Sequence, residues 1–142
     1  MQTVLFLCTG NYYRSRFSEH YFNHLAAQKD LGWRADSRGL ALERGQNNAG
    51  PISKYARQGL LSRNIQLSDP LRFPLPLTLN DLNASHQVIA VDETEHRPLI
   101  HARFPDWENK IHYWCVHDVD RENPDEALKQ LENHIQDLIS RL

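Results

Sequence analysis

The sequence contains only two cysteines, Cys8 and Cys115, too few for a disulfide-stabilised secreted scaffold. No apolar run approaches the roughly 20 residues that a membrane-spanning helix needs. The N-terminus also lacks a basic stretch followed by a long apolar one, so we expect no signal peptide. Together these absences predict a cytoplasmic protein that does not enter a membrane.

An excess of basic charge is also absent, because the formal net charge is −2 over 142 residues. A nucleic acid or an anionic membrane surface would require a basic face, so we expect neither as a partner. The eight histidines are scattered, and no group of cysteines and histidines has the spacing of a metal site. The sequence therefore predicts neither a metal nor a cofactor.

The most informative stretch lies near the N-terminus, between a short apolar run and a helical pattern. The run Val4–Leu7 predicts a buried strand that ends in Cys8, and residues 9–13 form a loop before Arg14 and Ser15. A loop that closes on a helix N-terminus presents several backbone N–H groups to one point. The same environment favours the thiolate form of a cysteine at its base.

This arrangement predicts a site for a phosphate-like dianion beside a reactive cysteine. The Arg14 guanidinium is a planar fork that binds two phosphate oxygens at once. Gly10 and Asn11 tolerate the left-handed backbone that such a cradle needs. The alternative is a buried strand-end cysteine followed by a solvated arginine. The residues expected to bind phosphate are Thr9, Gly10, Asn11, Tyr12, Tyr13 and Arg14.

The rest of the chain alternates between strand and helix patterns. Further strands are expected at residues 32–37, 87–91 and 111–116, and helices after the loop, from Gly50, at 93–103 and from Asn123. This alternation predicts a single α/β domain over residues 1–142, with a doubly wound, four-stranded parallel sheet and helices on both faces. In such sheets ligands bind at the carboxyl ends of the strands.

Two further residues, Tyr55 and Cys115, lie within these patterns. Tyr55 shares one face of its predicted helix with Ile52, Ala56 and Leu60. Cys115 lies within the strand pattern at 111–116, which indicates burial, and a cysteine there is usually an inert small apolar residue.

The N-terminal motif resembles the signature of the low-molecular-weight protein tyrosine phosphatases. Residues 8–15 read CTGNYYRS, and the usual form of the signature is C-x-G-N-x-C-R-S-P. The resemblance implies a phosphatase of phosphomonoesters, with Cys8 as the nucleophile that forms a phosphocysteine and Arg14 as a phosphate ligand. Tyr13 stands in place of the second cysteine, and Arg16 in place of the proline.

The resemblance also implies two supporting serines. Ser37 and Gly39 match a Ser-x-Gly motif whose serine braces the phosphate-binding loop, so a contact between Ser37 and Asn11 is expected. Ser15 can offer its hydroxyl to the Cys8 sulfur, although a serine in the first turn of a helix often has no special role.

The general acid of the family is the Asp of an Asp-Pro pair that follows the last strand. Asp118 is the best match, two residues after Val116, but Val119 replaces the proline. Asp120 is the alternative acid, and the choice between them rests on position alone. A third interpretation is that both are solvated loop carboxylates.

The expected partners are phosphotyrosine-containing proteins or small aryl phosphates, together with phosphate, sulfate or vanadate as inhibitory anions. Many relatives carry an aromatic residue in the loop that corresponds to residues 43–50, and this sequence has none there. The altered Asp118-Val119 pair motivates a second function, a phosphate- or phosphoprotein-binding module with little turnover. An arsenate reductase is a weaker alternative, because those enzymes pass oxidation along additional cysteines and Tyr13 occupies one such position.

Overall fold

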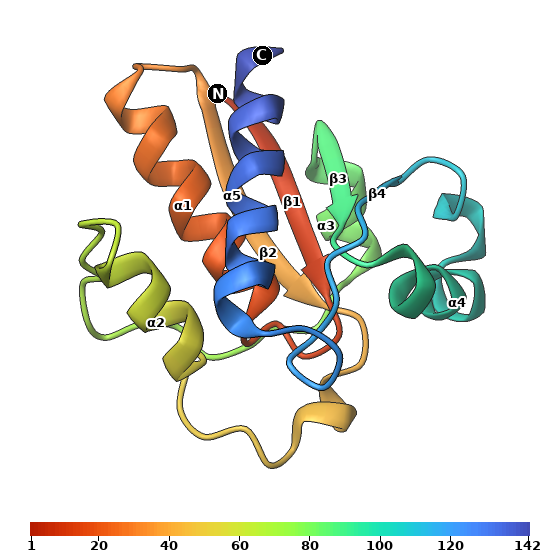
Figure 1. Cartoon of the computed structure of the whole chain (residues 1–142). Coiled ribbons are helices and arrows are strands. Elements are labelled where there is room, and N and C mark those ends of the chain that lie inside the picture. The colour runs from red at the N-terminus through yellow and green to blue at the C-terminus, as the bar shows by residue number, and fades with distance from the viewer.

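The computed structural model describes all residues, 1–142, and shows one α/β domain (Figure 1). The strands are β1 (Gln2–Cys8), β2 (Trp33–Gly39), β3 (Gln87–Ala90) and β4 (His112–Tyr113). The helices are α1 (Arg14–Gln28), α2 (Lys54–Leu61), α3 (Leu79–Ala84), α4 (Glu93–Arg103) and α5 (Pro124–Ser140), with 3₁₀ turns η1 (Leu42–Gly45) and η2 (Pro105–Trp107). None of the helices has the length and apolar character that a membrane crossing requires.

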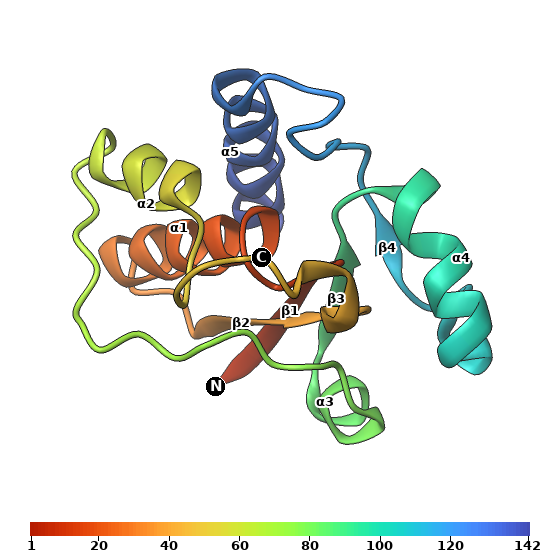
Figure 2. The same ribbon diagram turned by 90° about the horizontal axis from the view of Figure 1, so that it is seen from below.

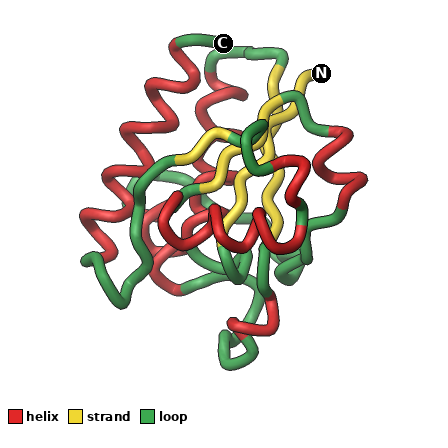
Figure 3. The backbone as a smooth tube through the Cα atoms, turned by 90° about the vertical axis from the view of Figure 1, so that its right-hand side faces the viewer, coloured by secondary structure: helices red, strands yellow, loops and turns green.

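The four strands form one parallel sheet in the order β2-β1-β3-β4. Helices α1, α2 and α5 pack on one face, and α3 and α4 pack on the other (Figures 2 and 3). The predicted doubly wound fold is therefore confirmed. Because all strands are parallel, their carboxyl ends meet at one edge of the sheet, which lies at the bottom of Figure 1.

Strand β1 is apolar and buried from Val4 to Cys8 because it lies inside the sheet and both of its faces are covered there. Val4, Phe6 and Cys8 join the core beneath α1 and α5, while Leu5 and Leu7 join the core beneath α3 and α4. Successive side chains of a strand point to opposite faces, so a continuous apolar run satisfies both cores.

The fourth strand is shorter than predicted, and one side chain in it is placed differently. Regular pairing stops at Tyr113, and the chain then forms an isolated antiparallel bridge between Asp92 and Cys115. Because β4 is the edge strand, no further strand covers this segment. Cys115 is consequently exposed, and the prediction that it is buried was wrong.

The second helix begins later than Gly50, where the sequence pattern placed its start. Gly50 has a positive φ of 77°, and the helix starts at Lys54, after Ser53. The Ser53 hydroxyl accepts a hydrogen bond from the Tyr55 N–H at 3.1 Å and caps the helix.

Candidate active site

The loop between β1 and α1 is fixed from inside by Asn11. Its φ of 51° lies in the left-handed region that asparagine tolerates. Its buried amide nitrogen donates to Ser15 Oγ at 2.9 Å and to Ser37 Oγ at 2.8 Å. The predicted contact between Asn11 and Ser37 is therefore confirmed. Gly39 completes this packing, because a Cβ there would approach the Asn11 backbone nitrogen to 3.1 Å.

Arg72 braces the same loop from the segment between α2 and α3. Its Nη1 donates to Asn11 Oδ1 at 2.9 Å, and its Nη2 donates to the Ser37 carbonyl at 2.8 Å. Its Nη2 also lies 3.3 Å from the Glu19 carboxylate. Nothing local in the sequence shows that this arginine reaches Asn11.

The backbone N–H groups of the loop have no partners within the chain. None of residues 9–14 donates its backbone N–H to a backbone or side-chain acceptor. Backbone donors in a folded protein are almost always satisfied, so a run of unsatisfied ones indicates a ligand-binding surface. Helix α1 begins at Arg14 and adds the positive end of its dipole at the same place. The loop is therefore built to bind an anion.

Cys8 lies at the base of this loop and is 3% exposed. Its sulfur is 2.9 Å from Ser15 Oγ, which confirms the predicted contact. Ser15 Oγ already accepts the Asn11 N–H, so its own proton is free to point at the sulfur. A hydroxyl that donates to sulfur stabilises the thiolate relative to the thiol.

The Arg14 side chain is buried and is held by acceptors from two other segments. Its Nη1 donates to the Val116 carbonyl at 2.9 Å and lies 3.5 Å from Asp92 Oδ2. Its Nη2 donates to Glu95 at 2.8 Å and lies 3.6 Å from Asp118 Oδ2. Burial alone would lower the pKa of Arg14, but the charges of Cys8, Glu95 and Asp118 raise it above its ordinary value, so it stays a cation.

Cys8 and Arg14 open into a cavity of ≈ 230 Å³. The residues that line it come from the loop, from α2 and the segment before it, and from the segment after β4. They are Cys8, Gly10, Tyr12, Tyr13, Arg14, Asn48, Ser53, Tyr55, Asp118 and Val119. This small, deep cavity has a nucleophilic sulfur at its base and an arginine in its wall.

The structure brings Asp118, but not Asp120, to this cavity. Asp118 lines it, and its side chain is 42% exposed. One of its carboxylate oxygens accepts the Val119 N–H at 2.8 Å, and the other faces Arg14. Asp120 is exposed and lines no part of the cavity. Cys8 and Asp118 line the same cavity because Cys8 ends β1 and Asp118 follows β4, and both strands have their carboxyl ends at the same edge of the sheet.

The aromatic wall of the cavity comes from α2 rather than from residues 43–50. Tyr55 is 38% exposed and lines the cavity, although its spacing in the sequence places it on one helix face with Ala56 and Leu60. Its ring packs edge-on against the ring of Tyr13, with centroids 6.1 Å apart. Tyr12 lies on the same cavity, and its hydroxyl donates to the Ala49 carbonyl at 2.6 Å.

The Tyr13 hydroxyl is buried and has no hydrogen-bond partner. Burial raises the pKa of Tyr13 above its ordinary value, and the charge of Asp118 raises it further, so the phenol stays protonated. Asn48 and Ser53 also line the cavity, and neither of them bonds to this hydroxyl. An unpaired polar group of this kind costs stability.

We expect Tyr13→Phe to stabilise the fold by about 1 kcal/mol, because it removes a buried hydroxyl that has no partner. The matched control is Tyr12→Phe, which removes a hydroxyl that is bonded to Ala49 and should cost about 0.5–1 kcal/mol. Urea denaturation with unchanged m-values measures both changes. Equal destabilisation by the two variants would show that the Tyr13 hydroxyl is satisfied after all.

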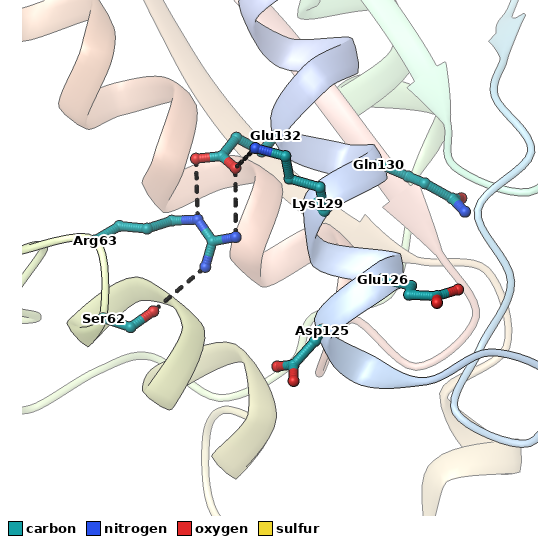
Figure 4. Close-up of a pocket in the computed structure, with 7 residues that line it drawn as sticks. All are labelled: Ser62, Arg63, Asp125, Glu126, Lys129, Gln130 and Glu132. Carbon is teal, nitrogen blue, oxygen red and sulfur yellow. Dashed lines mark hydrogen bonds and ion pairs between the residues drawn. The ribbon is translucent and has the colours of Figure 1, made fainter.

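A second, more open groove of ≈ 770 Å³ lies elsewhere, between α2 and α5 (Figure 4). Its lining residues are all polar, and none is a cysteine. The Arg63 guanidinium closes one end by pairing with Glu132 at 3.1 Å. The groove has no cysteine, so the cavity above Cys8 is the candidate active site.

The comparison with known families agrees with this geometry. Residues 3–141 match the family described as low molecular weight phosphotyrosine protein phosphatase. No curated protein is similar enough in sequence to match the chain.

Solved structures share the fold over essentially the whole chain. The low molecular weight protein tyrosine phosphatase from T. tengcongensis is 25% identical, with a TM-score of 0.82 and coverage of 100% of both chains. The enzyme of the same class from Streptococcus pyogenes is 23% identical, with a TM-score of 0.82, and the match covers 100% of this chain and 93% of that one. The YwlE arginine phosphatase from Geobacillus stearothermophilus is 21% identical, with a TM-score of 0.77, and the match covers 99% and 92%.

Proposed function

Because the chain belongs to the low molecular weight phosphotyrosine protein phosphatase family, we propose that it hydrolyses phosphomonoesters through a phosphocysteine on Cys8. The proposed substrate is tyrosine phosphate in proteins or peptides. The proposed phosphate ligands are the backbone N–H groups of residues 9–14 and the Arg14 side chain. A free cysteine thiolate needs a reducing compartment, so a cytoplasmic location belongs to the same proposal.

The observation that supports this proposal best is the run of unpaired backbone N–H groups that surrounds Cys8. Phosphoryl transfer depends mainly on positioning and on stabilising charge at the three equatorial oxygens. Donors fixed in place before the substrate arrives supply that stabilisation without reorganisation. Asn11, Ser37 and Arg72 hold the loop in this shape before a substrate binds.

The reaction takes two steps. In the first, the Cys8 thiolate attacks phosphorus, the bond from phosphorus to the ester oxygen breaks, and protonated Asp118 gives its proton to the leaving oxygen. In the second, Asp118 takes a proton from water, the water oxygen attacks phosphorus, and Cys8 leaves as the thiolate. Arg14 and the loop N–H groups bind the equatorial oxygens in both steps. Ser15 stabilises the thiolate whenever it leaves.

The preference for an aryl ester is supported by the aromatic walls. Tyr12, Tyr13 and Tyr55 line the cavity together with Val119, so a flat ring bound above Cys8 would contact apolar surface on several sides. A related structure, Wzb from Vibrio vulnificus, holds benzylphosphonate, an aryl-containing phosphate analogue. That structure is 16% identical to this chain and shows only that the fold accommodates such a ligand.

Two other functions follow from specific observations. The similarity to arginine phosphatases makes phosphoarginine a second candidate substrate, and Asp118 would then face a guanidinium leaving group. The replacement of the usual proline by Val119 supports a phosphate-binding module with little turnover. An arsenate reductase is disfavoured because the only other cysteine, Cys115, is exposed beyond the end of the edge strand.

The experiment that tests the proposal compares turnover of four substrates at mildly acidic pH. These are an aryl phosphate, a phosphotyrosine peptide, a phosphoserine peptide and a phosphoarginine peptide. We expect turnover of the first two to exceed that of the others, with inhibition by vanadate. Preference for the phosphoarginine peptide would identify phosphoarginine as the substrate instead of phosphotyrosine. Tight vanadate binding without turnover of any substrate would favour the phosphate-binding module.

A further inference from the structure

Three carboxylates surround the one arginine of the cavity. Asp92 and Glu95 belong to the start of α4, and Asp118 belongs to the segment after β4. Glu95 makes the shortest of the three contacts with Arg14, at 2.8 Å. The sequence pattern predicted only a helix at residues 93–103, so no function was expected of Glu95.

Some N–H donors of the Arg14 guanidinium have acceptors within the protein, and the others have none. A guanidinium has five N–H donors. The two on Nη1 face the Val116 carbonyl and Asp92, and one on Nη2 is donated to Glu95. Asp118 Oδ2, at 3.6 Å from Nη2, is beyond hydrogen-bond distance. The Nε donor and the second Nη2 donor remain, which are the two that a bidentate phosphoryl group needs.

Glu95 is itself held by three donors that meet at one of its oxygens. Glu95 Oε2 accepts from the Thr9 hydroxyl, from Arg14 Nη2 at 2.8 Å and from His96 Nε2 at 3.0 Å. Thr9 directly follows Cys8, so the carboxylate links the phosphate-binding loop to α4. Burial would raise the pKa of Glu95, but the His96 hydrogen bond, the Arg14 charge and the Thr9 hydroxyl lower it well below its ordinary value.

The fully buried His96 has a single tautomer that suits this role. Its Nδ1 accepts the backbone N–H of Asp92 at 3.1 Å, so its proton is on Nε2 and points at Glu95 and Thr9. Burial lowers the pKa of His96, so the ring stays neutral and donates one fixed hydrogen bond. The backbone N–H of Asp92 therefore fixes the orientation of the His96 ring, and the ring N–H fixes the position of the Glu95 carboxylate.

We propose that Glu95 is a positioning residue that anchors Arg14 through one Nη2 donor and leaves Nε and the second Nη2 donor free for the phosphoryl group. The role rests on the proposed function, since the group that Arg14 binds is the substrate phosphate. Its fixed negative charge also lies beside the place where a dianion binds, so it weakens ground-state phosphate binding while it aligns the arginine. Two substitutions of Glu95 separate its effect on the alignment of Arg14 from the effect of its negative charge on phosphate binding.

Glu95→Gln keeps an oxygen that can accept from Arg14 and removes the charge. We expect orthophosphate to bind about tenfold more tightly to this variant, because one like charge near the dianion is gone. We expect kcat for an aryl phosphate to stay within about threefold of the native value, because the anchor is kept. Titration calorimetry with orthophosphate and steady-state kinetics measure the two effects.

Glu95→Ala removes the anchor as well as the charge. We expect kcat to fall about 10- to 100-fold with a much smaller change in KM, because the freed guanidinium is no longer aligned in the transition state. The matched control is Glu93→Gln in the same helical turn. Glu93 pairs with Arg97 at 3.0 Å and makes no contact with Arg14, so this variant should match the native protein in both measurements.

The outcomes separate this inference from the proposed function. Tighter orthophosphate binding by Glu95→Gln, together with loss of kcat only in Glu95→Ala, supports the positioning role. Native kcat and native phosphate affinity in both Glu95 variants would overturn it, and so would weaker phosphate binding in both with a parallel loss of thermal stability. If the native protein shows no turnover, the proposed function fails, and the calorimetric comparison still decides whether Glu95 opposes anion binding.

Discussion

Replacing Cys8 by serine is expected to lower turnover of an aryl phosphate by about 10⁴-fold or more while phosphate binding is retained. A serine hydroxyl at this site is a much weaker nucleophile, because it is not ionised near neutral pH. The donors that bind the phosphate, which are the N–H groups of residues 9–14 and Arg14, are unchanged by the substitution. The variant should therefore bind orthophosphate with an affinity close to that of the native protein.

Two measurements check this expectation. Rapid acid quench of the native protein should trap a phosphoryl group on Cys8, and the serine variant should release no burst of the aryl alcohol. The matched control is Cys115→Ser, because Cys115 is exposed and lies outside the cavity. This variant should turn over the substrate at the native rate. Substantial turnover by Cys8→Ser would exclude the phosphocysteine mechanism, and loss of turnover in the Cys115 variant would show that a second thiol takes part.

Asp118→Asn is expected to lower kcat by about 10²- to 10³-fold, and Asp120→Asn is expected to change it by less than about twofold. The difference follows from position, because Asp118 lines the cavity with Cys8 whereas Asp120 is exposed away from it. The loss in Asp118→Asn should be smaller for substrates with good leaving groups, which need less protonation. Both substitutions remove one charge from the same loop, so each serves as a control for the other.

The pH dependence of kcat distinguishes Asp118 from Asp120 as the general acid. A general acid acts only while it carries its proton, so a kcat that depends on one falls on the alkaline side. Asp118→Asn should show no such fall, because an amide does not titrate, and Asp120→Asn should keep it. An alkaline limb that persists in Asp118→Asn and disappears in Asp120→Asn would transfer the acid role to Asp120.

The parts of this molecule that follow local rules were predictable from sequence. Strand β1 is a continuous apolar run because both faces are covered, and α5 begins where Asn123 and Pro124 predict, with the Asn123 side chain accepting the Asp125 N–H at 2.8 Å. The proximity of Cys8 and Asp118 was also predictable. It required only the topological rule that parallel strands end at one edge of the sheet.

The features that depend on contacts between residues far apart in the sequence were not predictable. Glu95 lies in an ordinary helical pattern, and nothing near it in sequence shows that it contacts Arg14 and Thr9. Tyr55 has the spacing of a core residue, but α2 begins beside a cavity that periodicity cannot reveal. Cys115 has the pattern of a buried strand, but burial also depends on whether another strand lies beyond it, and none does.

The tyrosine at position 13 bears on how the protein withstands peroxide. A sulfenic acid on Cys8 can be rescued by condensing with a nearby thiol, and the phenol of Tyr13 offers none. Cys115 follows β4, which is separated from β1 by β3, so strand spacing alone places the two cysteine Cα atoms about 10 Å apart. That exceeds the roughly 7 Å limit for a disulfide. We therefore expect the rate of irreversible inactivation by peroxide to depend on a thiol from another molecule. That thiol must react with the sulfenic acid on Cys8 before a second peroxide does.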